Sequence, residues 1–377
     1  MAAYPLKWPK TPSTLVSSTC YILARNTHIP EPQKKSKCHY LHIGKVNKLC
    51  PGMKVHGVEA DKVEEAVYLG DIIRQDGKNS SNIRSRANKG MGIVTKIMDI
   101  LKAISFGDKY FEIATALREA ELINGILTNA EVWYGVQQNE IDELEEVDKL
   151  LLRRILGAPD STCIESLYLE LGLIPIRILI KARRINYLHY LIQLKEEEML
   201  SKVFQTQLKY PAKDDWTVQV QKDLLDLEIN LTFEEMKKRS HDSFKRYVKI
   251  KTKEYSLDYL LKLKEKHSKM ENLDYIELKL QNYLKDNEIS VQEAKNLYRF
   301  RTRAANFKEN QKNNHEMSVA CPLCQVQPDT QAHCVQCPVV RTKIDVKGTY
   351  SDIFSEDIPS DISQTLMKIS KLRENLS

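Results

Sequence analysis

The sequence predicts a mainly α-helical protein with a small β fragment on its N-terminal side and a cysteine-rich knuckle near its C-terminus. After Asn82, apolar residues recur at helical spacing for more than two hundred residues. Before Asn82, the apolar runs are short, and glycine, proline or charged residues separate them. Four of the eight cysteines fall within the seventeen residues 321–337.

Length and composition limit the class of protein. At roughly 150 residues per domain, 377 residues allow about two domains with ordinary cores. Hydrophobic residues make up 42% and charged residues 29%, which excludes a wholly disordered chain. The most apolar run, 171–180, contains glycine, proline and arginine, so no run resembles a membrane span. Three prolines stand where a signal peptide needs an apolar helix, so we expect an intracellular protein of the nucleus or cytoplasm with no membrane partner.

The N-terminal part predicts a disordered leader followed by three short strands. Residues 1–36 show no sustained period of either kind. Strand-like runs follow at 38–43, 53–58 and 66–73. An Asp-Gly pair at 76–77 closes the last strand, because this pair favours a tight turn.

Three capping boxes and one glycine–proline break mark the helix boundaries. In a capping box, a Ser or Thr caps the first turn and a Glu three residues later pairs with the amide of the cap residue. Gly172 and Pro175 separate a short helix from a longer one at 176–194. The predicted boxes are Thr162 with Glu165, Thr232 with Glu235, and Ser290 with Glu293.

Charge is segregated along the chain, although the net charge is only +6 from 57 basic and 51 acidic residues. Residues 74–118 carry nine basic and four acidic residues, and residues 237–266 carry eleven and four. Between them, residues 119–150 carry nine acids and one Lys. Phosphate binding depends on local cation density, so the basic segments are candidate polyanion-binding surfaces. The alternative is a set of solvated helix faces.

The strongest chemical signal is the cluster of Cys321, Cys324, His333 and Cys337. Two cysteines with two residues between them can grip one side of a zinc ion, and a His and a Cys four positions apart can close the tetrahedron. Four ligands leave no open position, which predicts a structural Zn site. Ordering a residue costs on the order of 1 to 2 kcal/mol, whereas zinc supplies roughly 10 to 16 kcal/mol in comparable peptides. Cys334 remains a competing ligand that could replace His333.

The sequence identifies no catalytic residue. Polymerase or nuclease chemistry needs carboxylates that hold magnesium in a dry cleft. The only adjacent aspartates, Asp214 and Asp215, follow no apolar strand, and a helix cap explains them better. A phosphate-binding Gly-rich loop, a zinc-protease His pair and a nucleophile elbow are also missing.

Basic residues alternate with aromatic residues at 244–247 and 298–303. Arginine can bind phosphates while the rings stack on exposed bases, which suits single strands or structured RNA. The alternative is that Tyr298 and Phe300 pack inward while the arginines stay solvated. The segment just before the cysteine cluster is the better candidate, because a metal knuckle beside a basic helix forms a compact cationic surface.

Several short segments form a recognisable series in their order along the chain. They are KCHYLHIGK at 37–45, VYLGDII at 67–73, LINGIL at 122–127, EVWYG at 131–135, and CPLC at 321–324 followed by Asp329, Thr330 and His333. Over about residues 37–345, the chain resembles the C-terminal part of a reverse transcriptase from a non-LTR retrotransposon. In that family, the Tyr-Leu-Gly segment ends the palm as the primer grip, the following helices form the thumb, and a zinc knuckle comes next.

The resemblance implies roles for individual residues and an order of domains. Tyr68, Leu69 and Gly70 would be primer-grip residues, and the four clustered Cys and His residues would be the knuckle ligands. The implied organisation is a leader at 1–36, a palm remnant at 37–80, a thumb-like helical array at 81–200, a helical linker at 201–315, a zinc knuckle at 316–345 and a tail at 346–377.

The chain also departs from the family. The family's catalytic aspartates lie upstream of the segment at 37–45, and the chain contains no aromatic-Ala-Asp-Asp motif. We therefore expect a truncated or domesticated product that binds RNA or an RNA–DNA duplex without polymerase or nuclease activity. The alternatives are a structural or protein-interaction scaffold, or a polymerase part that needs fingers and palm from elsewhere. The expected phosphate contacts are Arg84, Arg86, Lys89, Lys96, Lys102, Arg299, Arg301 and Arg303.

Overall fold

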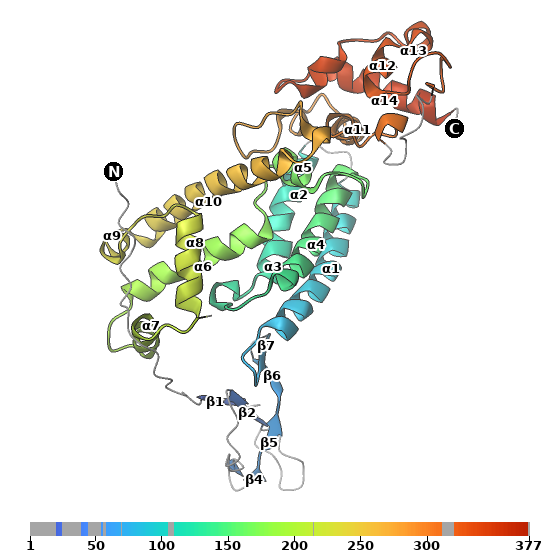
Figure 1. Cartoon of the computed structure of the whole chain (residues 1–377). Coiled ribbons are helices and arrows are strands. Elements are labelled where there is room, and N and C mark those ends of the chain that lie inside the picture. Colours follow the sequence, from blue (N-terminus) through green and yellow to red (C-terminus); the bar gives the residue numbers. More distant parts are fainter. Residues whose placement is uncertain are drawn as a thin grey trace. The chain divides into compact units, whose positions relative to one another are not determined.

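The computed structural model describes residues 20–24, 39–43, 54–55, 58–68, 70–104, 109–213, 215–310 and 320–375. The chain is mainly helical, with a few short strands on its N-terminal side, as the apolar periods predict (Figure 1). In the described ranges, every strand lies before residue 75 and every helix after residue 79.

A three-stranded sheet forms around β2 (His39–Ile43). Strand β1 (Cys20–Ala24) pairs with β2 in the antiparallel sense, and β5 (Asp61–Val63) pairs with it in the parallel sense. A second pairing joins β3 (Lys54–Val55) to β4 (Val58–Glu59). Strand β1 falls within the leader that we expected to be irregular. The sequence does not reveal this strand, because its partner is a later segment and no local period marks it. The rest of that leader lies outside the described residues.

The single strand predicted at 66–73 is instead a hairpin. Strands β6 (Glu65–Tyr68) and β7 (Asp71–Arg74) pair in the antiparallel sense. Gly70 turns the chain between them with a φ of 87°, a left-handed value that glycine adopts without strain. The prediction failed because β6 is largely exposed and no apolar alternation separates the two strands.

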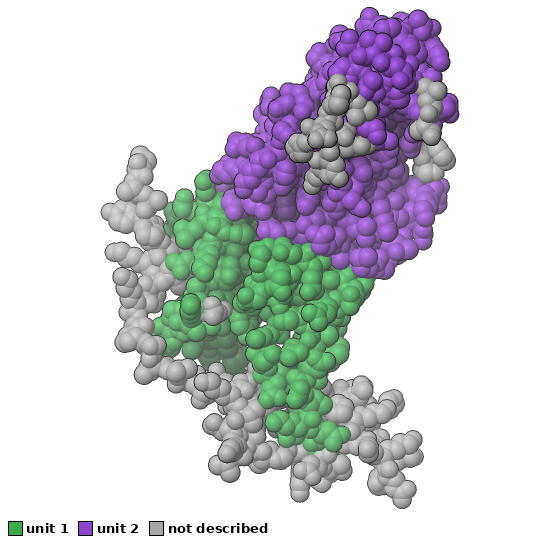
Figure 2. Space-filling view, turned by 45° about the vertical axis from the view of Figure 1, so that its right-hand side comes forward, with its two compact units in different colours: residues 1–89, 126–144, 180–249 green, residues 90–125, 145–179, 250–377 purple. Residues whose placement is uncertain are grey.

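The chain forms two compact units, which Figure 2 shows in different colours. Unit 1 contains residues 1–89, 126–144 and 180–249, and unit 2 contains residues 90–125, 145–179 and 250–377. The units therefore alternate along the chain, whereas the predicted domains followed one another. All five boundaries between segments fall inside helices, so no loop or change in composition marks them.

Fourteen α-helices and a π-helical turn at Arg118–Ile123 carry most of the described chain. The helices are α1 (Ser80–Ala103), α2 (Tyr110–Leu117), α3 (Asn124–Ile126), α4 (Gln138–Leu156), α5 (Ile164–Leu171), α6 (Ile176–Gln193), α7 (Met199–Lys209), α8 (Trp216–Asp226), α9 (Phe233–Lys237), α10 (His241–Lys264), α11 (Val291–Arg301), α12 (Gln331–Gln336), α13 (Pro338–Lys343) and α14 (Ser360–Glu374).

Two of the three predicted capping boxes are confirmed. Thr232 caps α9 and Ser290 caps α11, and in both cases the Glu at the third helical position bonds back to the cap residue. The box predicted at Thr162 does not form. Cys163 is the N-cap residue of α5, without a side-chain hydrogen bond to the helix, and Glu165 points to other partners.

The core of unit 2 buries a charged group among its apolar side chains. Arg118 is fully buried, and its guanidinium donates to Asp148 from Nε to Oδ1 at 2.7 Å and from Nη2 to Oδ2 at 2.6 Å. The hydroxyl of Tyr168 donates to the same carboxylate at 3.1 Å. Burial and the Asp148 carboxylate raise the pKa of Tyr168 well above its ordinary value, so the hydroxyl keeps its proton. We call Arg118, Asp148 and Tyr168 the ion-pair core.

Candidate metal centre

A tight turn presents the first two cysteines of the predicted cluster. Ala320 and Pro328 form an antiparallel bridge that closes the loop. Inside it, the amide of Cys321 donates to the carbonyl of Gln327 at 2.7 Å, and the amide of Gln325 donates to the carbonyl of Cys321 at 2.9 Å. Gln325 takes a left-handed φ of 60°, which reverses the chain directly after Cys324.

Helix α12 and the residue directly after it supply the other two residues. Thr330 caps this helix, since its hydroxyl accepts from the amide of His333 at 3.0 Å. This cap fixes the first turn, from which the Nε2 of His333 reaches the sulfur of Cys324 at 3.3 Å. Cys337 follows the last turn of α12 and is the N-cap residue of α13, where Pro338 occupies the first position.

The structure brings the four predicted ligands together. Cys321, Cys324, His333 and Cys337 each place one ligand atom within 4.8 Å of the others. Cys321 and Cys337 are buried, and Cys324 and His333 are half-buried. Cys334, the competing ligand, is buried outside the cluster, because neighbouring residues of a helix point about 100° apart. A Cys₃His donor set within one turn and one helix fits a tetrahedral metal ion.

Backbone amides tune the sulfurs of this cluster. The amides of Gln327 and Val326 bond to the sulfur of Cys324 and, with help from His333 and Cys321, lower the pKa of this thiol to about 6. Burial raises the pKa of the Cys337 thiol, although the amides of Val340 and Val339 oppose that effect. Amide donors placed at sulfur stabilise thiolates, which are the form that binds a metal.

Helices α11 and α14 support the metal-binding loop. Asp329 is buried and accepts two hydrogen bonds from Arg373, at 2.7 and 3.0 Å, and one from the amide of Lys308 at 3.1 Å. The side chain of Gln331 donates to the carbonyl of Phe300 at 2.8 Å. These contacts attach the C-terminal end of the loop to the rest of unit 2, so the cluster is not an isolated appendage.

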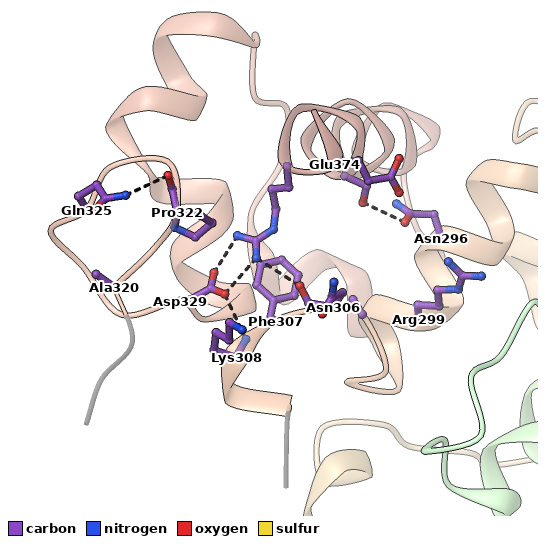
Figure 3. A pocket seen from close by; sticks show the side chains of 13 residues that line it. Asn296, Arg299, Asn306, Phe307, Lys308, Ala320, Pro322, Gln325, Asp329 and Glu374 are labelled. Carbon is purple, nitrogen blue, oxygen red and sulfur yellow. Dashed lines mark hydrogen bonds and ion pairs between the residues drawn. The ribbon is translucent and has the colours of Figure 1, made fainter. Parts of the chain in front are cut away.

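A pocket of about 490 Å³ opens beside the loop (Figure 3). Arg299 and Asn296 reach it from α11, Lys308 and Asn306 from the following segment, and Gln325 from the metal-binding loop. The buried amide nitrogen of Asn296 has no hydrogen-bond partner among the described residues. Two acids also line the pocket: Asp329, which pairs with Arg373, and Glu374.

The three arginines expected beside the knuckle occupy different environments. Arg301 is 3% exposed, binds Glu170 at 3.1 Å and stacks over the ring of Tyr283. This inward position is opposite to the exposed one that we expected. Arg303 is partly exposed and binds Glu271 at 2.7 Å. Arg299 donates from Nε to the carbonyl of Gly157 at 2.7 Å and pairs with no carboxylate in the described part of the chain.

The residues of the β6–β7 hairpin and of α1 that we expected to contact nucleic acid also differ in their exposure. Tyr68 and Gly70 are exposed, and Leu69 lies outside the described residues. Arg86 is buried and donates to Asp71 at 2.6 Å, so it holds the hairpin to α1 instead of facing solvent. The four remaining cations are exposed. Three of them have an acidic neighbour: Arg84 lies 3.9 Å from Glu143, Lys96 lies 3.0 Å from Glu121, and Lys102 lies 3.3 Å from Asp99. Lys89 has no acidic partner in the described ranges.

Three of the four aromatic residues in the two basic segments point inward, whereas Tyr247 is half-exposed. Tyr298 and Phe300 are buried, and the hydroxyl of Tyr298 lies 2.7 Å from that of Ser166. Phe244 is buried as well and stacks on His189. The alternative in which Tyr298 and Phe300 pack inward is therefore confirmed. Phe244 was not part of that alternative but is buried as well, so none of these three rings offers a surface on which bases could stack.

Sequence reasoning missed a second cluster, formed by Cys163, Glu165 and His267. Cys163 is one of the four cysteines outside the cluster at 321–337, and Glu165 belongs to a predicted capping box. His267 comes from a segment far along the chain, so no local spacing could connect the three. The one related feature in the sequence is the capping-box spacing of Thr162 and Glu165, which the structure does not use as a cap.

Comparison of the chain with family models, with curated proteins and with solved structures found no match. The fold and the geometry of the clusters therefore carry the functional argument. Within the described part of the chain, no helix has the length and apolar character to cross a membrane.

Proposed function

We propose that the chain is a retroelement-derived protein that binds RNA or an RNA–DNA duplex through the region around its Cys₃His cluster. The observation that carries the proposal is the pocket in Figure 3, in which three cationic side chains, one of them paired with Asp329, stand beside three amide side chains at the edge of the metal-binding loop. Cations bind phosphates, and amides bind base edges.

Zinc is the ion that we assign to Cys321, Cys324, His333 and Cys337. Three thiolates and one imidazole in tetrahedral reach suit zinc, and four protein ligands make the site structural. The ion would hold Gln325 and Pro322 in place at the rim of the pocket. Its role in binding is therefore to shape the surface and not to contact the nucleic acid.

Arg299 is the residue best placed to contact a phosphate. The bond from its Nε to the carbonyl of Gly157 fixes the side chain, and no carboxylate in the described ranges competes for it. Lys308 is exposed on the same pocket. At about 490 Å³, the pocket has room for one unpaired nucleotide, since small-molecule sites span about 300–1,000 Å³.

The retroelement origin rests on the resemblance and agrees with the exposure of the β6–β7 hairpin. Val67 is 70% exposed and Tyr68 is 50% exposed, as a strand that contacts a primer would require. We place no catalytic residue in the chain and expect no nucleotide incorporation by it alone. Primer extension with magnesium by the purified protein would replace this proposal with a polymerase. The nucleus or the cytoplasm is the location that these functions and the free thiols favour.

Salt-dependent binding tests the proposal. We would measure the anisotropy of labelled single-stranded RNA and of an RNA–DNA duplex at several salt concentrations. Affinity should fall with salt, with a log–log slope of about −0.7 to −0.9 per phosphate contacted. Arg299→Ala should weaken binding and reduce the slope by about one phosphate.

Arg303→Ala is the matched control, because Arg303 lies on the same segment but pairs with Glu271. It should change the affinity and the slope much less than Arg299→Ala does. Salt-independent binding, or equal effects of the two substitutions, would contradict the proposal.

A scaffold is the second candidate, and the ion pairs of the acidic block favour it. Asp148 binds Arg118, Glu145 binds Arg177 at 2.6 Å, and Lys96 binds Glu121 at 3.0 Å. Much of the charge segregated in the sequence is thus paired internally. A scaffold would show no nucleic-acid binding at physiological salt, and Arg299→Ala would leave its other interactions unchanged.

A further inference from the structure

We propose that Cys163, Glu165 and His267 form a second metal site in unit 2, with three protein ligands and a fourth position open to water. One thiol, one carboxylate and one imidazole place their ligand atoms within 4.8 Å of one another. Cys163 and Glu165 lie at the start of α5, and His267 lies just after α10. The inference is independent of nucleic-acid binding.

The distances suit a zinc-sized ion after a small adjustment. An ion about 2.3 Å from sulfur and about 2.0–2.1 Å from nitrogen and oxygen separates tetrahedral neighbours by about 3.3–3.6 Å. The Oε2 of Glu165 lies 3.4 Å from the Nε2 of His267, inside that range. The sulfur of Cys163 lies 2.7 Å from the same oxygen, so it must move away by less than about 1 Å.

Glu165 is an exception among the buried carboxylates. Among the described residues, five other Asp and Glu side chains are buried, and an arginine binds each of them: Glu145 with Arg177, Asp148 with Arg118, Glu170 with Arg301, Asp223 with Arg184, and Asp329 with Arg373. Glu165 is 9% exposed and has neither a Lys nor an Arg partner in the described ranges. A buried carboxylate without a cation is costly, and a divalent ion would supply the missing charge.

Helix α5 begins at this site without a side-chain cap. The sequence at Thr162 and Glu165 has the capping-box spacing that works at two other helices. Here Glu165 accepts from Cys163 instead, and the buried hydroxyl of Thr162 has no partner in the described part of the chain. Places where local preferences are overridden are often functional sites.

The donor set selects the type of metal. Thiolate and imidazole favour zinc over magnesium or calcium, which prefer oxygen ligands. Cys163 would bind as a thiolate after losing its proton to solvent, and together with Glu165 it would balance the two charges of the ion. His267 is half-exposed, so water reaches the fourth position. This differs from the knuckle, whose four ligands leave no position open.

Zinc stoichiometry tests the site in the full chain. The protein would be stripped of metal, reloaded with Zn²⁺, desalted and analysed by mass spectrometry of the metal. We expect two zinc ions per chain in the wild type and one fewer in His267→Ala. His267 lies outside a helix and is half-exposed, so the substitution leaves the fold intact, as circular dichroism would verify. His241→Ala, at an exposed histidine outside the cluster, should retain both ions.

The comparison between variants separates this site from the knuckle. If His267→Ala binds as much zinc as the wild type, the assignment is overturned. Substitution of Cys321 should remove one ion and leave the one that depends on His267. Glu165→Gln, which keeps the shape of the side chain, should lower the affinity for the second ion by about 100-fold or more. Loss of a residue that only supports a metal ligand already lowers metal affinity by about 10–100-fold. Unchanged affinity in that variant would also overturn the assignment.

Cobalt provides a second readout. With Co²⁺ in place of Zn²⁺, the second equivalent should add a thiolate-to-cobalt absorption that Cys163→Ser removes. The knuckle absorption should be the same in both proteins. A second equivalent that adds no thiolate absorption to the wild type would contradict Cys163 as a ligand.

Discussion

The knuckle at 320–337 and the ion-pair core belong to the same unit, but they stabilise their polar groups in different ways. In the ion-pair core, Arg118 and Asp148 neutralise each other, and Tyr168 binds the same carboxylate, so nothing external is needed. In the knuckle, three sulfurs and an imidazole converge within 4.8 Å. Thiolates at such distances repel one another until a cation joins them. The first region is therefore stable on its own, whereas the second depends on a metal.

Metal removal should have the largest effect on this difference. A strong chelator should unfold the knuckle and leave the ion-pair core folded, because zinc contributes roughly 10 to 16 kcal/mol to comparable small sites. Hydrogen exchange, followed by peptide, would show loss of protection in 320–343 and none around Arg118. Added Zn²⁺ should restore the protection. Unchanged exchange in the knuckle after chelation would sink the metal assignment.

Thiol reactivity offers a finer test of the metal-free knuckle. The pKa of Cys324 is about 6, so at pH 7 this thiol is mostly thiolate. Burial raises the pKa of Cys334, which keeps its proton. Alkylation in the first moments after chelation, before the knuckle unfolds, should therefore modify Cys324 well before Cys334, as mass spectrometry would show. Equal rates would show that the amide donors do not act on Cys324 as described.

Breaking the ion pair should be the next largest effect. Asp148→Ala removes the two hydrogen bonds that the carboxylate accepts from Arg118 and leaves the buried guanidinium with the half-exposed carboxylate of Glu119 and the carbonyl of Ile174, which should lower the free energy of unfolding by about 3 kcal/mol. The double substitution Arg118→Met with Asp148→Leu should recover most of that loss, because no charge is then buried. Urea unfolding monitored by circular dichroism measures both. Zinc content should stay constant throughout, and a loss of zinc in Asp148→Ala would show that the two regions are coupled.

A glycine at the end of α5 predicts a smaller effect. Gly172 has a φ of 65°, and a Cβ there would meet the backbone of Lys279 and Leu280. Gly172→Ala should therefore cost about 2–3 kcal/mol from strain and overlap together. Gly135 has a φ of 60° but open space around it, so Gly135→Ala should cost only about 1 kcal/mol. Equal losses of melting temperature would argue against the close approach at Gly172.

The helix caps should give the smallest effects. Ser290→Ala removes a complete capping box and should cost about 1 kcal/mol. Thr162→Val removes a buried hydroxyl that makes no hydrogen bond to a described residue, so it should be neutral or slightly stabilising. Thermal unfolding of the two variants would separate them. A clear loss in Thr162→Val would indicate a partner for that hydroxyl.

Local patterns predicted what depends on neighbours in sequence. The helical period and two capping boxes depend on residues three or four positions apart, and the knuckle ligands lie within seventeen residues; the structure agrees with each. The turn at Gly70 was missed even though it is local, because no break in the apolar pattern separates β6 from β7.

Contacts between distant segments could not be predicted from local patterns. Charge counts made Arg86 and Arg301 look available, but the carboxylates of Asp71 and Glu170 hold them inside the fold. The partners lie 15 and 131 residues away, and the direction of a long side chain follows from its partner. Glu165 was assigned to a cap for the same reason, since His267 gave no signal near it.

The alternation of the two units along the chain has a consequence for synthesis. Unit 1 draws its last segment from residues 180–249, whereas unit 2 needs the segment that begins at residue 250. A chain that emerges from the ribosome can therefore close unit 1 first, while the earlier segments of unit 2 wait for their partners. Until then, the apolar residues around Arg118 and Glu170 remain open to solvent and to chaperones. Zinc loading is among the last steps of maturation, because the knuckle ligands lie at 321–337.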